Sequence, residues 1–306
     1  MTATFLLAAA ALSASGTAWT GPTMLQRARW PANAPRAAFV LWYALGLSGL
    51  LSTLGVIVAM GIRPWRMALL PGLQRALWCL VECRWGAFSL LQLTLLLLAV
   101  GIGLQLVVLL ANEFRHVALD RRKHRRVLGL VAQSDSGRGM LVMDHPSTFA
   151  YGVPGLRPKV VLSTGTLSAL SERELRAVLA HERAHFHARH DLAVLPFAAL
   201  ASALPRLPLA RDGLASMRAL VEMLADDAAV RHESTTALAG AIVRVAGGAV
   251  SAGVLSPGGG VAGRVQRLSA DRSPGAKRAA PLAYAAACLI VAVPCLLLLA
   301  ASTHLR

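Results

Sequence analysis

The chain has 306 residues, of which 56% are hydrophobic and only 15% are charged. Soluble domains carry about 25% charged residues, so this composition excludes a fully soluble protein and indicates a membrane protein with a smaller soluble part. Basic residues beside membrane spans explain the net charge of +16. Because no aromatic residues are interleaved with them, we expect no direct nucleic-acid partner.

Two apolar segments among the first 60 residues are predicted to cross the membrane. Residues 3–19 have arginines after them and no basic residue before them. This favours a retained span with its amino end outside, with a cleaved signal peptide as the alternative. Residues 37–60 contain no charged residue, and this length is enough to cross a hydrocarbon core of about 30 Å.

Two more spans are predicted, over residues 86–112 and residues 281–302. A dense group of basic residues from Arg115 to Arg126 follows the first of them, and such a cluster marks the cytoplasmic side. The loop of residues 61–85 is then placed outside, although it carries four arginines against one glutamate.

These spans divide the chain into three parts. The sequence predicts a membrane domain with three transmembrane helices over residues 1–112, a cytoplasmic domain over residues 113–280, and a last span with a short tail over residues 281–306. The soluble domain is thus inserted between three spans before it and one after it.

Short β-rich pieces open the predicted cytoplasmic domain, at residues 127–132, 139–144 and 159–163, and helices follow them. This is an α+β layout within a mostly α-helical chain. Residues 192–210 are apolar but contain three prolines. This predicts a helical hairpin packed under the helix that carries His181 and His185, or lying on the membrane surface, with a further membrane span as the alternative. A Gly- and Ser-rich stretch at 247–260 predicts a loop.

The strongest chemical signal is the sequence His-Glu-Arg-Ala-His at residues 181–185. Residues four apart lie on one helix face, so His181 and His185 can direct two imidazoles at one zinc ion, with Glu182 beside them as a base. Ser171 and Glu174 have the spacing of a capping box, which predicts that this helix starts at Ser171.

A second helix, predicted over residues 215–232, carries carboxylates among alanines and leucines. Glu222 and Asp226 are four residues apart and share one face. Buried carboxylates need a partner, so we expect these two to meet a metal, a histidine or an arginine. Asp227 is the alternative to Asp226.

Together these motifs resemble the membrane zinc metallopeptidases of the BlaR/MecR antibiotic-sensor type, which share a gluzincin core with the HtpX and CAAX-prenyl proteases. The resemblance covers roughly residues 113–270 and extends to the order of three spans, protease and final span. The segments that carry it are Asp144, Phe149–Gly152, Val161–Gly165, Leu170–Leu175, Val178–His185, Asp191 and Glu222–Asp226.

The resemblance implies one Zn²⁺ per chain, with His181, His185 and Glu222 as ligands and Glu182 as general base. Asp226 would orient a ligand histidine. The reaction would be peptide-bond hydrolysis, with the substrate extended along a strand near residues 149–152.

Four other histidines are weaker candidates. His187 and His190 fall off the face of His185, so we expect solvent-side or loop roles for them. His145 and His232 could stabilise a developing oxyanion, a role that the motif assigns to no residue.

The resemblance favours a multi-pass protease of a bacterial cell membrane that cleaves a cytoplasmic transcriptional repressor. Sensor-type proteins carry an extracellular ligand-binding domain after their last span, whereas four residues follow Ser302 here, so a signal would arrive through the spans, the outer loops or a partner protein. The alternatives are a quality-control protease like HtpX, acting on misfolded membrane proteins, and a zinc-binding scaffold that cleaves nothing. The sequence gives no indication of oligomeric state.

Overall fold

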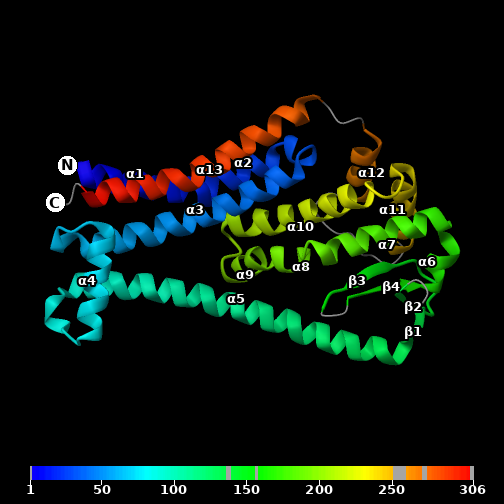
Figure 1. Ribbon diagram of the computed structural model, residues 1–306, viewed down its shortest axis with the longest axis horizontal. Helices are drawn as coiled ribbons and strands as arrows, with labels where there is room; N and C mark the ends of the chain where they lie inside the picture. Colours follow the sequence, from blue (N-terminus) through cyan, green and yellow to red (C-terminus); the bar gives the residue numbers. More distant parts are fainter. Residues whose placement is uncertain (1, 136–138, 156–157, 251–259, 271–273, 304–306) are drawn as a thin grey trace.

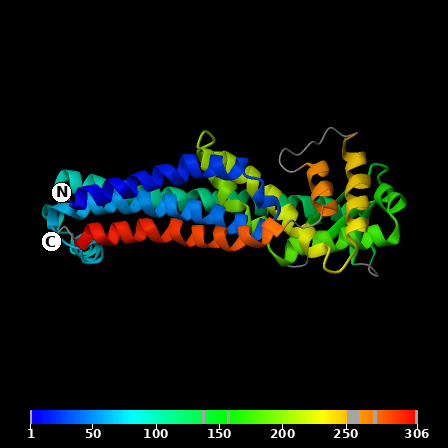
Figure 2. The same ribbon diagram turned by 90° about the horizontal axis from the view of Figure 1, so that it is seen from above.

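The computed structural model describes residues 2–135, 139–155, 158–250, 260–270 and 274–303. The molecule is elongated, with a helical bundle at one end and a small sheet covered by helices at the other (Figure 1). Both chain termini lie at the free end of the bundle, and the view from above shows the same arrangement (Figure 2).

Long apolar helices build the bundle. Within the described residues, three helices are long and apolar enough to cross a membrane: Pro35–Trp65, Leu90–Val131 and Ala279–Ala301. The first contains the whole predicted span 37–60, and the other two cover residues 90–112 of the predicted span 86–112 and residues 281–301 of the predicted span 281–302. They correspond to α3 (Pro35–Ile62) with η3 (Arg63–Trp65), to α5 (Leu90–Val131) and to most of α13 (Pro274–Thr303).

The predicted first span is helical but interrupted. Helix α1 (Thr2–Ser15) passes into a π-helical turn, η1 (Gly16–Thr20), and then into α2 (Gly21–Arg27). The Thr17 hydroxyl donates to the carbonyl oxygens of Ser13 and Ala14, both at 3.0 Å, and such bonds compete with the regular helical ladder. This segment is not among the three long apolar helices, so a span there stays a prediction.

The loop between the second and third spans is mostly helical. It contains α4 (Leu69–Val81) and the short turn η4 (Trp85–Ala87), and another short turn, η2 (Trp30–Ala32), precedes α3.

The predicted strand at residues 127–132 is wrong. Helix α5 continues without a break to Val131 and runs from the bundle to the sheet (Figure 1). Of this apolar run only Leu128 is buried, against Val153 and Val161, while Leu130 is 87% exposed. A short apolar run fits a strand or a helix equally well by periodicity, and here it is the last turn of a long helix.

The sheet has four strands in the order β1-β2-β4-β3. Strands β2 and β4 are parallel, and the other neighbours are antiparallel. The predictions at 139–144 and 159–163 are confirmed by β2 and β4, and β3 is an edge strand. The bounds are β1 (Ala132–Asp135), β2 (Met140–Met143), β3 (Ala150–Val153) and β4 (Lys159–Ser163).

Helices cover one face of the sheet. Met140, Val160 and Leu162 pack against Leu175 and Val178 of α7. The helices of this part are α6 (Thr164–Ala169), α7 (Glu172–His187), α8 (His190–Ala193), α9 (Leu195–Ala203), α10 (Pro208–Ala229), α11 (Thr235–Val250) and α12 (Val261–Ser269). Because α11 continues to Val250, the predicted loop begins later than residue 247, and its residues 251–259 lie outside the described part.

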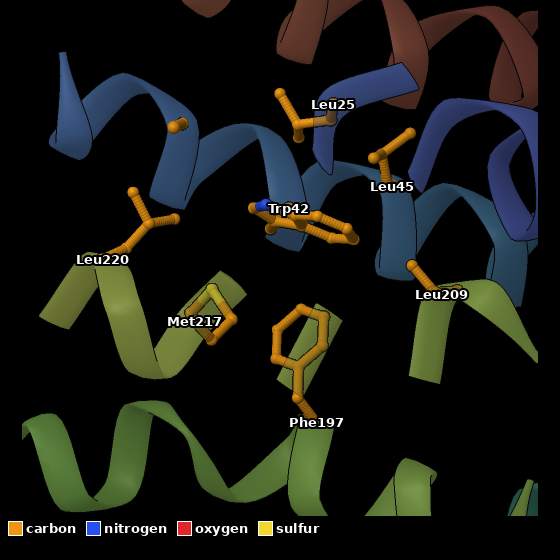
Figure 3. Close-up of a cluster of buried hydrophobic side chains, with 8 residues drawn as sticks. Leu25, Trp42, Leu45, Phe197, Leu209, Met217 and Leu220 are labelled. Atoms are coloured by element: carbon orange, nitrogen blue, oxygen red, sulfur yellow. The ribbon is translucent and has the colours of Figure 1, made fainter. Parts of the chain in front are cut away.

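A shared hydrophobic core joins the bundle to the part of the chain that contains the sheet. Trp42 of α3 is 1% exposed and meets Phe197 of α9 edge to face, with ring centroids 6.3 Å apart. Met217 and Leu220 of α10 pack in the same cluster (Figure 3). The predicted hairpin at residues 192–210 is therefore helical and packs on α3, one of the three long apolar helices, so α10 is anchored at one end by the bundle.

Candidate metal centre

Helix α7 begins as the sequence predicts. The Ser171 hydroxyl accepts from the Glu174 backbone N–H at 3.4 Å, and the Ser171 N–H donates to the Glu174 carboxylate at 2.9 Å. This reciprocal capping box fixes the start of the helix. One face of α7 then packs on the sheet, which brings His181 and His185 to the side that faces α10.

Three metal-binding side chains converge between α7 and α10. The Nε2 atoms of His181 and His185 are 3.2 Å apart, and Glu222 oxygens lie 3.4 Å from the first and 3.6 Å from the second. Ligand atoms about 2.0–2.1 Å from a tetrahedral zinc ion are separated by about 3.3 Å. The set of two imidazoles and one carboxylate therefore fits zinc, and of the described residues it is the group that could hold a metal ion.

Asp226 lies behind the first histidine. Its Oδ1 is 3.0 Å from Nδ1 of His181, and its side chain is fully buried. A carboxylate on Nδ1 leaves Nε2 directed at the metal position and fixes the ring orientation. Asp227, which the sequence analysis gave as the alternative to Asp226, pairs instead with Arg267 at 2.6 Å.

The carboxylates of Asp226 and Glu222 share one more partner, an arginine that the sequence analysis did not single out. Arg264 of α12 donates to both oxygens of Asp226, at 2.6 and 2.9 Å, and its second terminal nitrogen lies 3.0 Å from Glu222. The carboxylates of α10 were expected to meet a metal, a histidine or an arginine, and they meet a histidine and this arginine. Its position, 38 residues away in the chain, follows no local pattern.

The electrostatics of the cluster keep its carboxylates ionised. Burial disfavours the charged forms, but hydrogen bonds with His181 and the charge of Arg264 lower the pKa of both Glu222 and Asp226 to about 2. Burial also lowers the pKa of His185, to about 4. Against its own burial, hydrogen bonds to Asp226 and Glu222 raise the pKa of His181 to about 9.

His190 corrects one expectation from the sequence. It is buried rather than solvent-facing, and its Nδ1 lies 3.1 Å from Nδ1 of His185. Burial lowers the pKa of His190, which keeps its ring neutral, and a neutral ring nitrogen can accept a hydrogen bond from Nδ1–H of His185. His187 is exposed, as expected, and its Nδ1 is 2.7 Å from the carbonyl oxygen of Arg183.

Glu182 faces a cavity of about 670 Å³ that also contains the three candidate ligands. Burial raises the pKa of its carboxyl, and the Gly152 N–H of β3 donates to it. His145 and His232 do not line this cavity, so neither is placed to stabilise an oxyanion there. The edge strand β3 forms one wall through Ala150, Tyr151 and Gly152.

Gly152 is required by close packing. A Cβ at this position would lie 2.6 Å from the Phe186 ring and 3.0 Å from Glu182 Oε2.

We expect Gly152→Ala to displace Glu182 or β3 and to lower kcat/KM by about 100-fold, the scale of a 1 Å misplacement. Peptide hydrolysis and zinc content are measured together, and zinc content should not change. In the control Gly129→Ala the new Cβ meets open space. Full activity of Gly152→Ala would show that the close contact between β3 and Glu182 is not needed for the reaction.

The comparisons with known proteins agree with this geometry. The sequence model of peptidase family M48 matches residues 120–278, just over half of the chain, and the matched range contains the sheet and helices α7, α10 and α12. Enzymes of this family are in general zinc-dependent peptidases. No curated protein and no solved structure matches the chain. The chain belongs to peptidase family M48.

Proposed function

We propose that this chain is an integral-membrane zinc metalloendopeptidase in which His181, His185 and Glu222 hold the metal and Glu182 is the general base. The observation that carries the proposal is the meeting of three ligand atoms within 4.8 Å of one another beside the half-buried carboxylate of Glu182. When bound, zinc polarises the scissile carbonyl and activates a water molecule.

The residues of the chain supply the proton transfers and the positioning. Glu182 accepts a proton from the attacking water and returns it to the leaving amine. Because burial raises its pKa, the protonated form is easier to reach than in solution, which suits a group that must carry a proton between two steps. Asp226 and His190 orient the two ligand histidines.

The free edge of β3 is the proposed substrate platform. Among the described residues, β4 is the strand that pairs with β3, and residues 150–152 line the cavity. An extended peptide added to this edge would form main-chain hydrogen bonds and place its scissile bond near Glu182. This geometry favours unfolded or extended protein segments as substrates.

We further propose a multi-pass protein of a bacterial cell membrane with the catalytic part in the cytoplasm. The basic residues that follow the apolar part of α5 support this side. A sensor-transducer protease that cleaves a repressor is our first choice because the site is tied to the bundle. Arg121 of α5 pairs with Asp191, next to His190, at 2.8 Å, and α10 shares a core with α3.

New protein amino termini in cells expressing the wild-type chain, compared with cells expressing Glu182→Ala, test this function. Termini on a DNA-binding repressor that are absent from the variant would establish the sensor-transducer role. Scattered termini on membrane proteins would instead establish an HtpX-like quality-control role. Identical profiles under several envelope stresses, with zinc retained in both proteins, would contradict proteolysis and favour a scaffold.

A further inference from the structure

A second cavity, of about 730 Å³, lies on the far side of α7 from the candidate ligands. Arg176, Arg183 and His187 line it at positions i, i+7 and i+11, which share one helix face. His181 and His185 lie on the opposite face. Alanines of α7 and α10 line it as well, and their small side chains leave room between the helices.

The lining of this cavity is strongly basic. It contains four arginines and three histidines against a single glutamate, Glu233, which is 3.4 Å from Arg176. The other three arginines, Arg36, Arg183 and Arg231, are exposed. Such a concentration of guanidinium groups around a hollow attracts a compact anion with several acceptor oxygens, and phosphate has the geometry that arginine binds best.

The membrane supplies such an anion. Arg36 is the second residue of α3, one of the three helices long enough to cross a bilayer, so the cavity lies at the end of this helix that would face the membrane surface on the side of the sheet. Basic pockets at the cytoplasmic face of membrane helices bind phosphorylated lipid head groups. We propose that this cavity binds the phosphate head group of an anionic phospholipid of the surrounding leaflet.

This site requires α3 to be a membrane span but does not depend on proteolysis. It nevertheless lies close to the catalytic machinery, because His190 lines both cavities and contacts His185. A lipid bound there would be separated from the candidate zinc ligands by one side chain. Lipid composition would then be one of the conditions that the peptidase senses.

Native mass spectrometry of the full chain in detergent tests the site, with phosphatidylglycerol and phosphatidylcholine of identical acyl chains as probes. We expect tighter binding of phosphatidylglycerol, and a fall in its affinity of roughly tenfold or more in R36Q/R183Q, since each basic residue near an anionic surface contributes about fivefold. The control R115Q/R122Q removes two exposed arginines of α5, outside the cavity, and should keep the preference.

Three results would overturn the proposal: equal binding of the two lipids, an equal loss in the control, or displacement of the lipid by inorganic phosphate at similar concentration. The readout needs no peptidase activity, so it succeeds or fails separately from the proposed function. If R36Q/R183Q does not fold, as judged by its unfolding midpoint, the single variants R36Q and R231Q replace it, and unchanged affinity in both would equally overturn the site.

Discussion

Asp226→Asn is expected to reduce zinc affinity by about 10–100-fold, the usual effect of losing a carboxylate that orients a ligand histidine. Asp226 holds His181 Nδ1 at 3.0 Å and is fully buried. The amide keeps the shape of the side chain but removes the charge, so the imidazole loses the partner that fixes its orientation. Competition with a chelator of known affinity measures this loss.

The same substitution should also destabilise the fold by about 3–5 kcal/mol, because it removes the carboxylate that pairs with two nitrogens of Arg264 and leaves this mostly buried arginine with Glu222 as its charged partner. Arg264 makes two short hydrogen bonds to Asp226, and its side chain is only 17% exposed. The loss should therefore be visible in chemical unfolding of the metal-free protein. An unchanged unfolding midpoint would show that Glu222 alone compensates Arg264.

Asp227→Asn is the matched control for both effects. Asp227 is the neighbouring residue and pairs with Arg267 of the same helix α12 at 2.6 Å, but its side chain is 20% exposed. Arg267 also donates to the Ala32 carbonyl oxygen, so it keeps a partner. We expect a smaller loss of stability and unchanged zinc affinity. Equal loss of zinc in both variants would mean that α12, rather than Asp226, positions the ligand.

The parts of the site that the sequence predicts are those encoded within one helix. The spacing of His181 and His185, the capping box at Ser171 and the shared face of Glu222 and Asp226 all depend on the helical period. In the structure these residues lie together as the helical spacing predicts. Arg264 and Gly152 act from elements that are distant in the chain, so no local period reports them. His190 is only five residues from His185, but it lies after the end of α7, where the helical period no longer applies.

The fold, like the site, was predictable only in the parts that depend on local sequence patterns. Two strands and three long apolar helices follow from composition and alternation, but the end of α5 and the role of α9 do not. An apolar helix buried against protein and one exposed to lipid have the same composition. The contacts of Phe197 with Trp42 and Tyr43 show that α9 packs on the bundle, and they join the bundle to the site.

Glu182→Gln is expected to lower kcat by about 10²–10⁴-fold, the usual contribution of a general base. The glutamine has nearly the same shape but cannot accept the proton of the attacking water. Hydrolysis of the substrate identified from the new amino termini gives the rate, and metal analysis of the same samples gives the zinc content. Because Glu182 is assigned as the base and not as a ligand, zinc content should stay at the wild-type level.

The stability of the Glu182→Gln variant is a second measurement that tests the assignment of Glu182. Burial raises the pKa of Glu182 in the fold, so its ionised form costs stability at pH values above its ordinary pKa, and a neutral amide removes that cost. The unfolding midpoint at pH 7 should therefore not fall. Glu172→Gln makes the same chemical change at the exposed start of α7 and should leave kcat unchanged. Loss of zinc in Glu182→Gln would make Glu182 a ligand, whereas full activity would transfer the role of base to another residue of the cavity.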